Sequence, residues 1–155
     1  MEEYLLEARE ELKRLEHIIY VSLKYTRTVD VLRNALNRMV DMFDLVVFAY
    51  LEKAKEEGSS DTFPKSPALR AKIVGDMYSD DENLQKYLSF YAFMKNILKK
   101  EFKKREEFRR HVTMIVDLEK STAEVNIDNL MNCEKYVHHF YNYSWKKLKG
   151  IVDEE

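Results

Sequence analysis

The chain has 155 residues, of which 45% are hydrophobic and 35% charged, and its formal net charge is −2. This balance is typical of a folded globular domain and excludes an intrinsically disordered chain. The length predicts a single domain, 1–155, with a core of its own. No apolar run approaches the roughly 20 residues that cross a bilayer, and the acidic, amphipathic N-terminus is unlike a signal peptide. We therefore expect a cytoplasmic protein that does not enter membranes.

Few residues interrupt helices in this chain, which has only three Gly and two Pro. Apolar residues at steps of three and four predict a first helix over residues 3–24. Thr28 is suited to cap a second helix that ends near Glu57, before Gly58. Between Met39 and Leu51 this second helix is apolar on nearly every side, which predicts that it is central and the most buried.

A polar loop separates the first two helices from the rest of the chain. Residues 58–67 are rich in turn-forming residues, and Ser66 with Pro67 opens a short third helix over 67–78. The apolar periodicity then predicts a fourth helix over 82–110.

The helical pattern fails after residue 110. Residues 112–125 are expected to be irregular, and their β-branched start, Val112–Val116, could form an extended segment or a short strand. A last helix is expected over 126–149. The expected fold class is all-α, an up-and-down bundle of four long helices plus one short helix.

Two carboxylates interrupt the apolar run of the second helix. Asp41 and Asp44 are three residues apart and therefore share one face of that helix. A buried, unpaired carboxylate is costly, so each aspartate is expected to be exposed, paired with a cation or functional.

The densest charge lies between Lys99 and His111, where seven Lys or Arg accompany three Glu. If the fourth helix continues to residue 110, Arg105 lies on its core-facing stripe, with Asp41 or Asp44 as the available partner. That arginine then belongs to a structural ion pair or holds a phosphate in a two-pronged contact. The alternative to a functional basic cluster is that Lys99–His111 is simply the charged, solvated end of a helix. Further candidate phosphate contacts are Lys103, Lys104, Arg109 and Arg110.

His111 stands where the helical pattern ends, six residues after Arg105. A neutral imidazole can accept the proton of a ribose 2′-hydroxyl, and a nearby arginine can stabilise the phosphorane that forms. The two side chains converge only if the helix ends or bends near Arg110. Arg105 and His111 are therefore candidate catalytic residues, on a spacing that also occurs by chance in helical proteins.

The sequence does not predict a metal site. Glu134 and His138 are four residues apart, whereas a di-iron bundle uses Glu-x-x-His from two helices and two further glutamates. Cys133 is the single cysteine, which excludes an internal disulfide and sites built from several cysteines. Gly-rich phosphate loops, nucleophile elbows and zinc-protease motifs are absent from the sequence. We expect neither a metal nor another cofactor.

Two segments carry a family resemblance. Ile18–Leu36 (IIYVSLKYTRTVDVLRNAL) and Arg105–Met114 (REEFRRHVTM) resemble an archaeal family of small all-helical proteins, which in turn is similar to the HEPN superfamily. HEPN domains are helical bundles, usually dimeric. Active members are metal-independent ribonucleases with an Arg-x4-6-His motif, and others bind nucleotides or partner a nucleotidyltransferase.

The resemblance implies roles for two residues. His111 would transfer the proton, and Arg105 would bind the phosphate and the transition state. Active HEPN members usually place a small polar residue after the arginine, whereas this chain has Glu106.

Three functions are therefore expected as alternatives. The first is a HEPN-like protein that binds RNA or nucleotide phosphates and acts as a metal-independent ribonuclease. The second is a catalytically inert module that binds phosphates through the Lys99–His111 segment. The third is a non-catalytic structural or interaction protein that forms a homodimer or joins a partner protein through apolar helix faces.

Overall fold

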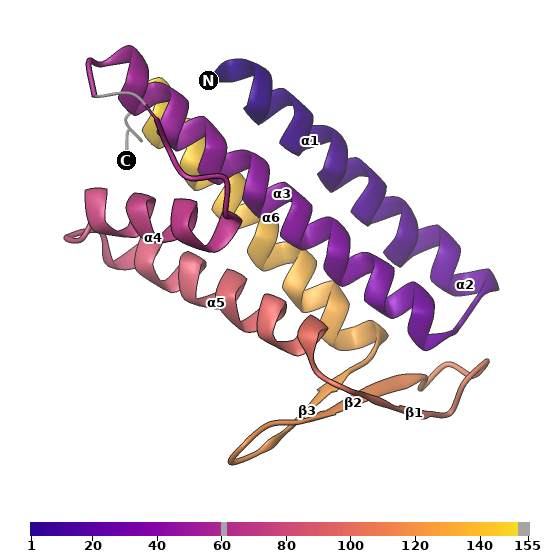
Figure 1. Ribbon diagram of the computed structural model, residues 1–155. Coiled ribbons are helices and arrows are strands. Elements are labelled where there is room, and N and C mark those ends of the chain that lie inside the picture. Colours follow the sequence, from indigo (N-terminus) through magenta and orange to yellow (C-terminus); the bar gives the residue numbers. More distant parts are fainter. Residues whose placement is uncertain (60–61, 152–155) are drawn as a thin grey trace.

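Four long helices run side by side, and a small sheet crosses one end of them (Figure 1). The computed structural model describes residues 1–59 and 62–151. The long helices are α1 (Glu2–His17), α3 (Val29–Glu56), α5 (Glu82–Lys99) and α6 (Ile127–Lys149). The expected bundle is therefore present, but the fold is not purely all-α, because a three-stranded antiparallel sheet is part of it.

The first predicted helix is present as one helical segment made of three parts. After α1 come a five-residue π-helix, η1 (Ile18–Ser22), and a last short turn, α2 (Leu23–Tyr25). Thr28 caps the next helix as predicted, since its hydroxyl accepts a hydrogen bond of 3.3 Å from the amide of Val31. That helix, α3, extends to Glu56, one residue short of the predicted end.

α3 is the central helix, as its apolar composition predicts. Twelve of its residues are buried, and it contacts α1, α4, α5 and α6. Aromatic rings join it to two neighbours: Phe43 stacks on Phe140 of α6 with centroids 4.1 Å apart, and on Tyr91 of α5 at 5.3 Å. Burying one such side chain contributes about 1.5–3 kcal/mol, so α3 with its twelve buried residues contributes substantially to the core.

The short third helix, α4 (Pro67–Met77), begins as predicted at Ser66, whose hydroxyl caps it at the Leu69 amide. The predicted loop over 58–67 includes residues 60 and 61, which lie outside the described residues. Among the residues described, no helix has the length and hydropathy that a membrane span requires.

The predicted fourth helix is wrong beyond Lys99. Instead of continuing to Arg110, the chain becomes extended at Lys100. Arg33 of α3 sets this end: its guanidinium donates to the carbonyl of Leu98 at 3.3 Å and lies 4.4 Å above the ring of Phe102. Residues 100–110 have good helix propensity, but these tertiary contacts override it.

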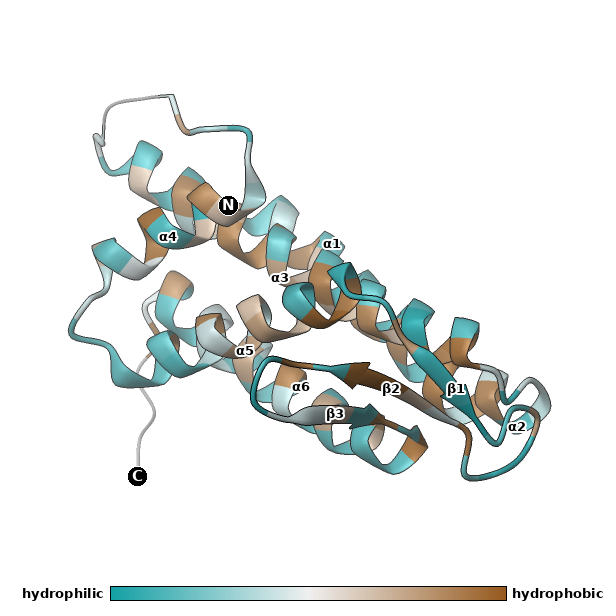
Figure 2. Ribbon diagram, turned by 60° about the horizontal axis from the view of Figure 1, so that its bottom comes forward, coloured by the Kyte–Doolittle hydropathy of each residue, from teal (hydrophilic) through white to brown (hydrophobic). Residues whose placement is uncertain are grey.

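The residues beyond Lys99 build the sheet. Strand β1 (Lys103–Arg105) pairs with β2 (Thr113–Asp117), and β2 pairs with β3 (Thr122–Val125), all antiparallel in the order β1-β2-β3. The predicted extended segment Val112–Val116 is thus confirmed as a strand, displaced by one residue. Figure 2 shows the hydrophobic β2 between two more polar strands. Met114 and Val116 of β2 are fully buried and join the core of the bundle.

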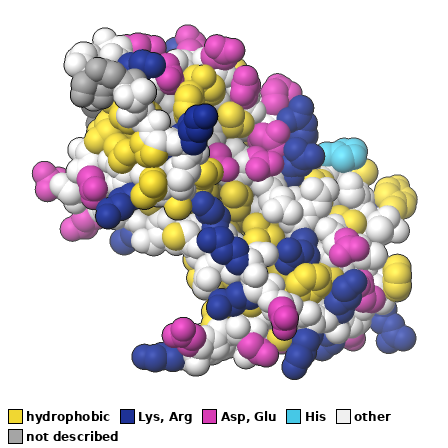
Figure 3. Space-filling model, viewed as in Figure 1, with side chains coloured by type: hydrophobic (Ala, Val, Ile, Leu, Met, Phe, Trp, Pro, Cys, Tyr) yellow, Lys and Arg dark blue, Asp and Glu magenta, His cyan; other side chains and the backbone are white. Residues whose placement is uncertain are grey.

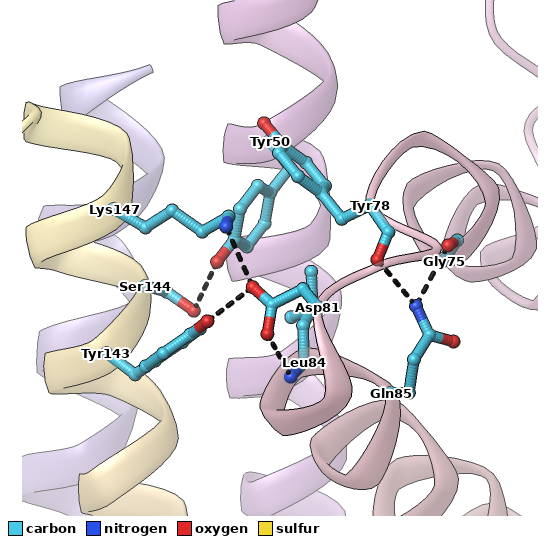
Figure 4. A network of polar contacts seen from close by, with 9 residues as sticks. All are labelled: Tyr50, Gly75, Tyr78, Asp81, Leu84, Gln85, Tyr143, Ser144 and Lys147. Atoms are coloured by element: carbon cyan, nitrogen blue, oxygen red, sulfur yellow. Dashed lines mark hydrogen bonds and ion pairs between the residues drawn. The ribbon is translucent and has the colours of Figure 1, made fainter.

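A polar network ties α6 to the turn between α4 and α5 (Figure 4). Asp81 caps α5 by accepting from the Leu84 amide at 3.0 Å, and it also accepts from Lys147 at 2.7 Å and from the hydroxyl of Tyr143. Burial alone would raise the pKa of Asp81, but these three hydrogen bonds outweigh it and lower the pKa below its usual value.

Asp81→Ala removes the cap and two side-chain partners together. We expect the free energy of unfolding at pH 7 to fall by about 2–4 kcal/mol, since a cap contributes about 1 kcal/mol and a charged hydrogen bond about 1.5–3. Urea denaturation measures the change. The control is the exposed neighbour in Asp80→Ala, which should shift stability by less than about 0.5 kcal/mol.

A comparison of the wild type with Asp81→Ala at different pH values tests the lowered pKa of Asp81. Because the pKa of Asp81 is lower in the folded than in the unfolded protein, its stabilisation is present above the unfolded value and is lost as pH falls through the folded one. The difference between the wild type and Asp81→Ala should therefore shrink below about pH 4. A difference that stays constant from neutral to strongly acid pH would contradict the assignment.

Candidate functional site

β1, β2 and the connecting residues 106–112 form a hairpin, here called the basic hairpin. It carries five exposed cations, and Figure 3 shows Lys and Arg side chains interspersed with acidic ones over the sheet end of the molecule. Lys104 pairs with Glu107 at 3.4 Å and Arg110 with Asp128 at 2.8 Å. Within the described residues, Lys103 and Arg109 have no ion-pair partner. The five cations are Lys103, Lys104, Arg105, Arg109 and Arg110.

Arg105 does not lie on a core-facing helical stripe, because the helix has already ended. It is the last residue of β1, in register with Thr113 and therefore on the sheet face opposite to the buried Met114. Its side chain is 48% exposed and forms an ion pair of 2.8 Å with Glu124 of β3. The expected pairing with Asp41 or Asp44 is thus replaced by a pairing across the sheet.

The two aspartates of α3 lie elsewhere in the bundle. Asp44 accepts a hydrogen bond from the hydroxyl of Tyr91, and burial raises the pKa of Asp44 although that hydrogen bond opposes the rise. Asp41 is exposed on the same helix. Neither forms an ion pair with Arg105 in the part of the chain that is described, so the structure does not bring these predicted site residues together.

His111 and Arg105 both lie in the basic hairpin. Arg105 ends β1, and His111 is two residues before Thr113, the residue opposite Arg105. The imidazole of His111 is exposed, while its backbone carbonyl accepts a hydrogen bond of 2.8 Å from the hydroxyl of Thr113. The hairpin thus places Arg105 at the end of β1 and His111 shortly before the start of β2.

The backbone of this loop is strained and anchored. Glu106 and Phe108 have φ of 53° and 68°, a left-handed conformation that is uncommon for residues other than glycine. The amide of Phe108 donates to the carbonyl of Arg27 at 2.7 Å, and the carboxylate of Glu107 accepts from the amide of Val29 at 3.1 Å. The loop is therefore held against the first turn of α3, where a carboxylate is favoured by the free amides and the helix dipole.

This anchoring displays aromatic rings to solvent. Phe108 is 78% exposed and Tyr25, at the end of α2, is 84% exposed. The Phe108 amide donates to the carbonyl of Arg27, two residues after Tyr25, so the hairpin loop packs against the corner between α2 and α3. Single exposed apolar residues need no explanation, but strained backbone that holds one outward among cations points to a binding surface. Sequence reasoning did not single out either ring.

A second polar cluster lies between α1 and α6. Glu134 and His138 are one turn apart on α6, as the sequence indicates, and the packing of α1 adds Glu16 to them. Sequence periodicity could not find Glu16, because its neighbourhood depends on how the two helices pack. These three residues could hold a metal ion, and their geometry is treated below.

Comparison with known proteins returned no match: no family model, curated protein or solved structure is similar to this chain. The HEPN resemblance therefore remains a prediction from the two quoted segments.

Glu107→Ala removes the contact that anchors the loop. We expect the free energy of unfolding to fall by about 1 kcal/mol, the usual contribution of a helix cap. We also expect faster amide exchange at Val29 and Phe108 and faster tryptic cleavage after Arg109. Hydrogen exchange with mass spectrometry and limited proteolysis measure these changes. Glu101→Ala, an exposed glutamate outside the loop, is the control, and equal exchange in both variants would contradict the anchoring role.

Proposed function

We propose that the basic hairpin and the adjoining α2–α3 corner bind single-stranded RNA or nucleotides. The observation that carries the proposal is a pair of exposed rings, Phe108 on the anchored and strained loop and Tyr25 at the end of α2. Next to Phe108 is the exposed Arg109, which has no ion-pair partner among the described residues. Proteins that bind single strands combine cations for the phosphates with aromatic rings on which bases stack.

The charge distribution favours a local site over general attraction to nucleic acid. The whole chain has a formal net charge of −2, and several hairpin cations are already paired with carboxylates. Long-range attraction is therefore weak, and affinity depends on short contacts to phosphates and bases. A short ligand that reaches both the rings and Arg109 fits this surface better than a long duplex.

Metal-independent cleavage is the catalytic form of the same proposal. His111 would accept the proton of the ribose 2′-hydroxyl, and Arg105 would stabilise the phosphorane. Arg105 would have to exchange its pairing with Glu124 for one with the phosphate, and Glu106 adds a negative charge beside it. Both features favour binding over rapid turnover.

The structural alternative, a non-catalytic homodimer or a complex with a partner protein, rests on other residues. Leu6 and Val21 are 47% and 40% exposed on the helical segment from α1 to η1 and could contribute to an interface. Light scattering of the purified protein tests the dimer, and a monomeric mass would remove it.

Binding to a labelled single-stranded RNA oligonucleotide in EDTA tests the proposal, with fluorescence anisotropy as the readout. A stacked base contributes about 1–3 kcal/mol, so Phe108→Ala should weaken binding by about 5- to 150-fold. The control Phe93→Ala removes a ring that is 45% exposed on α5 and should not change affinity. Equal affinity of both variants and the wild type would contradict the proposed surface.

Phosphate contacts are tested by the salt dependence of binding. The slope of log K against log salt is negative, and Arg109→Ala should reduce its magnitude by about 0.7, the value for one phosphate contact to a single strand. Lys86→Ala, an exposed lysine on α5, is the matched control.

The catalytic form is tested in the same EDTA buffer with a longer RNA. We expect any cleavage by the wild type to be lost in His111→Ala and retained in His139→Ala, which removes an exposed histidine of α6. Cleavage that persists in His111→Ala would exclude His111 as the proton acceptor. Binding without cleavage would leave the inert phosphate-binding module as the function.

A further inference from the structure

The cluster between α1 and α6 has an unusual feature for an ion pair: two carboxylates meet one nitrogen. Nε2 of His138 lies 2.8 Å from Oε1 of Glu16 and 2.9 Å from Oε1 of Glu134. An imidazole Nε2 carries at most one hydrogen, so it can donate one good hydrogen bond and not two. A hydrogen bond thus satisfies only one of the two carboxylates, whereas a cation among the three atoms satisfies all of them.

Burial limits how far water can solvate one of these carboxylates. The side chain of Glu134 is only 8% exposed, although it is a carboxylate on the core-facing side of α6. Its second oxygen accepts a hydrogen bond of 3.3 Å from the hydroxyl of Tyr20. Hydrogen bonding of this kind to a ligand's outer oxygen is what orients carboxylates at metal sites.

The local backbone supports the cluster. Tyr20 belongs to η1, the π-helix that begins two residues after Glu16. π-helical turns are rare and occur frequently at functional sites, because the wider turn changes which way the following side chains point. The helical segment that leaves α1 thus presents Glu16 to His138 and Tyr20 to Glu134, one turn apart on α6.

The spacing of the three atoms agrees with metal coordination. Bonds of about 2.0–2.2 Å from a metal to nitrogen and oxygen place neighbouring ligand atoms about 3 Å apart. The two carboxylate oxygens are within that range of Nε2, and one ligand atom from each residue lies within 4.8 Å of the others. Small side-chain movements would therefore complete a three-ligand site.

We propose that Glu16, Glu134 and His138 bind a first-row divalent metal ion, with Zn²⁺ as the first candidate. One imidazole and two carboxylates suit Zn²⁺ or Mn²⁺, whereas the imidazole disfavours Mg²⁺ and Ca²⁺. Two carboxylates neutralise the charge of the ion. This inference is independent of RNA binding and concerns a different surface.

The site also has room for a further ligand. A cavity of about 500 Å³ adjoins it, with Glu16 and His138 in its wall and with Arg9, Lys13 and Trp145 among the other lining residues. Three protein ligands and an accessible position are typical of metal sites that bind substrate or activate water. Because the cavity is lined by two cations, a phosphate or carboxylate group is the kind of ligand that fits beside the metal.

Isothermal titration of metal-free protein with ZnCl₂ tests the inference. We expect one Zn²⁺ per chain for the wild type, affinity lowered by about 100-fold in Glu16→Gln and in His138→Ala, and no comparable binding of MgCl₂. Glu16→Gln carries the test, because that side chain is 46% exposed and we expect its replacement to leave the fold intact, whereas the side chain of Glu134 is only 8% exposed. Circular dichroism checks the folding of each variant.

The control is the adjacent, exposed histidine. His139→Ala should bind Zn²⁺ like the wild type, and Zn²⁺ should raise the Tm of the wild type and of His139→Ala but not of Glu16→Gln. The inference is overturned if the wild type takes up no Zn²⁺, if Glu16→Gln binds it unchanged, or if His139→Ala loses it equally. Either of the last two outcomes would mean that Zn²⁺ binds nonspecifically to surface histidines. RNA binding in EDTA is unaffected by any of them, so the two proposals fail separately.

Discussion

The burial of α3 is the constraint on which the rest of the structure depends. Between Met39 and Leu51 its surface is apolar on nearly every side, so no single neighbour can cover it, and α1, α4, α5 and α6 all pack against the helix. The same helix positions the basic hairpin. Arg33 ends α5 and directs the chain into the sheet, and the free amides at its first turn hold the loop of the basic hairpin.

The helices could be predicted from the sequence wherever local signals and periodicity agree. Thr28, Ser66 and Gly150 mark helix ends correctly because capping is a local interaction between neighbouring residues. The prediction fails over residues 100–110, where every local preference favours a helix. What ends α5 is an arginine more than sixty residues earlier in the chain, and no pattern within the segment reports such a contact.

The candidate sites divide in the same way. The cations, Arg105 and His111 could be named from the sequence, but their partners could not: Glu124 replaces Asp41 and Asp44 because Arg105 lies on a strand instead of a helix. The exposure of Phe108 could not be predicted, because it depends on the left-handed backbone of Glu106 and Phe108. Glu16 joins Glu134 and His138 only through packing of α1 on α6, so the helical spacing of Glu134 and His138 alone argued against a metal.

The position of β1 in the sheet has a consequence for self-association. It is an edge strand, and all three of its residues are Lys or Arg. An unpaired strand edge is a template on which another chain can add a strand, and a row of like charges repels an identical edge. Under the proposed function, two separate demands act on these positions, attraction of phosphates and repulsion of copies. If these three cations were replaced by β-branched apolar residues, we expect a second copy of the chain to add a strand to the sheet at this edge.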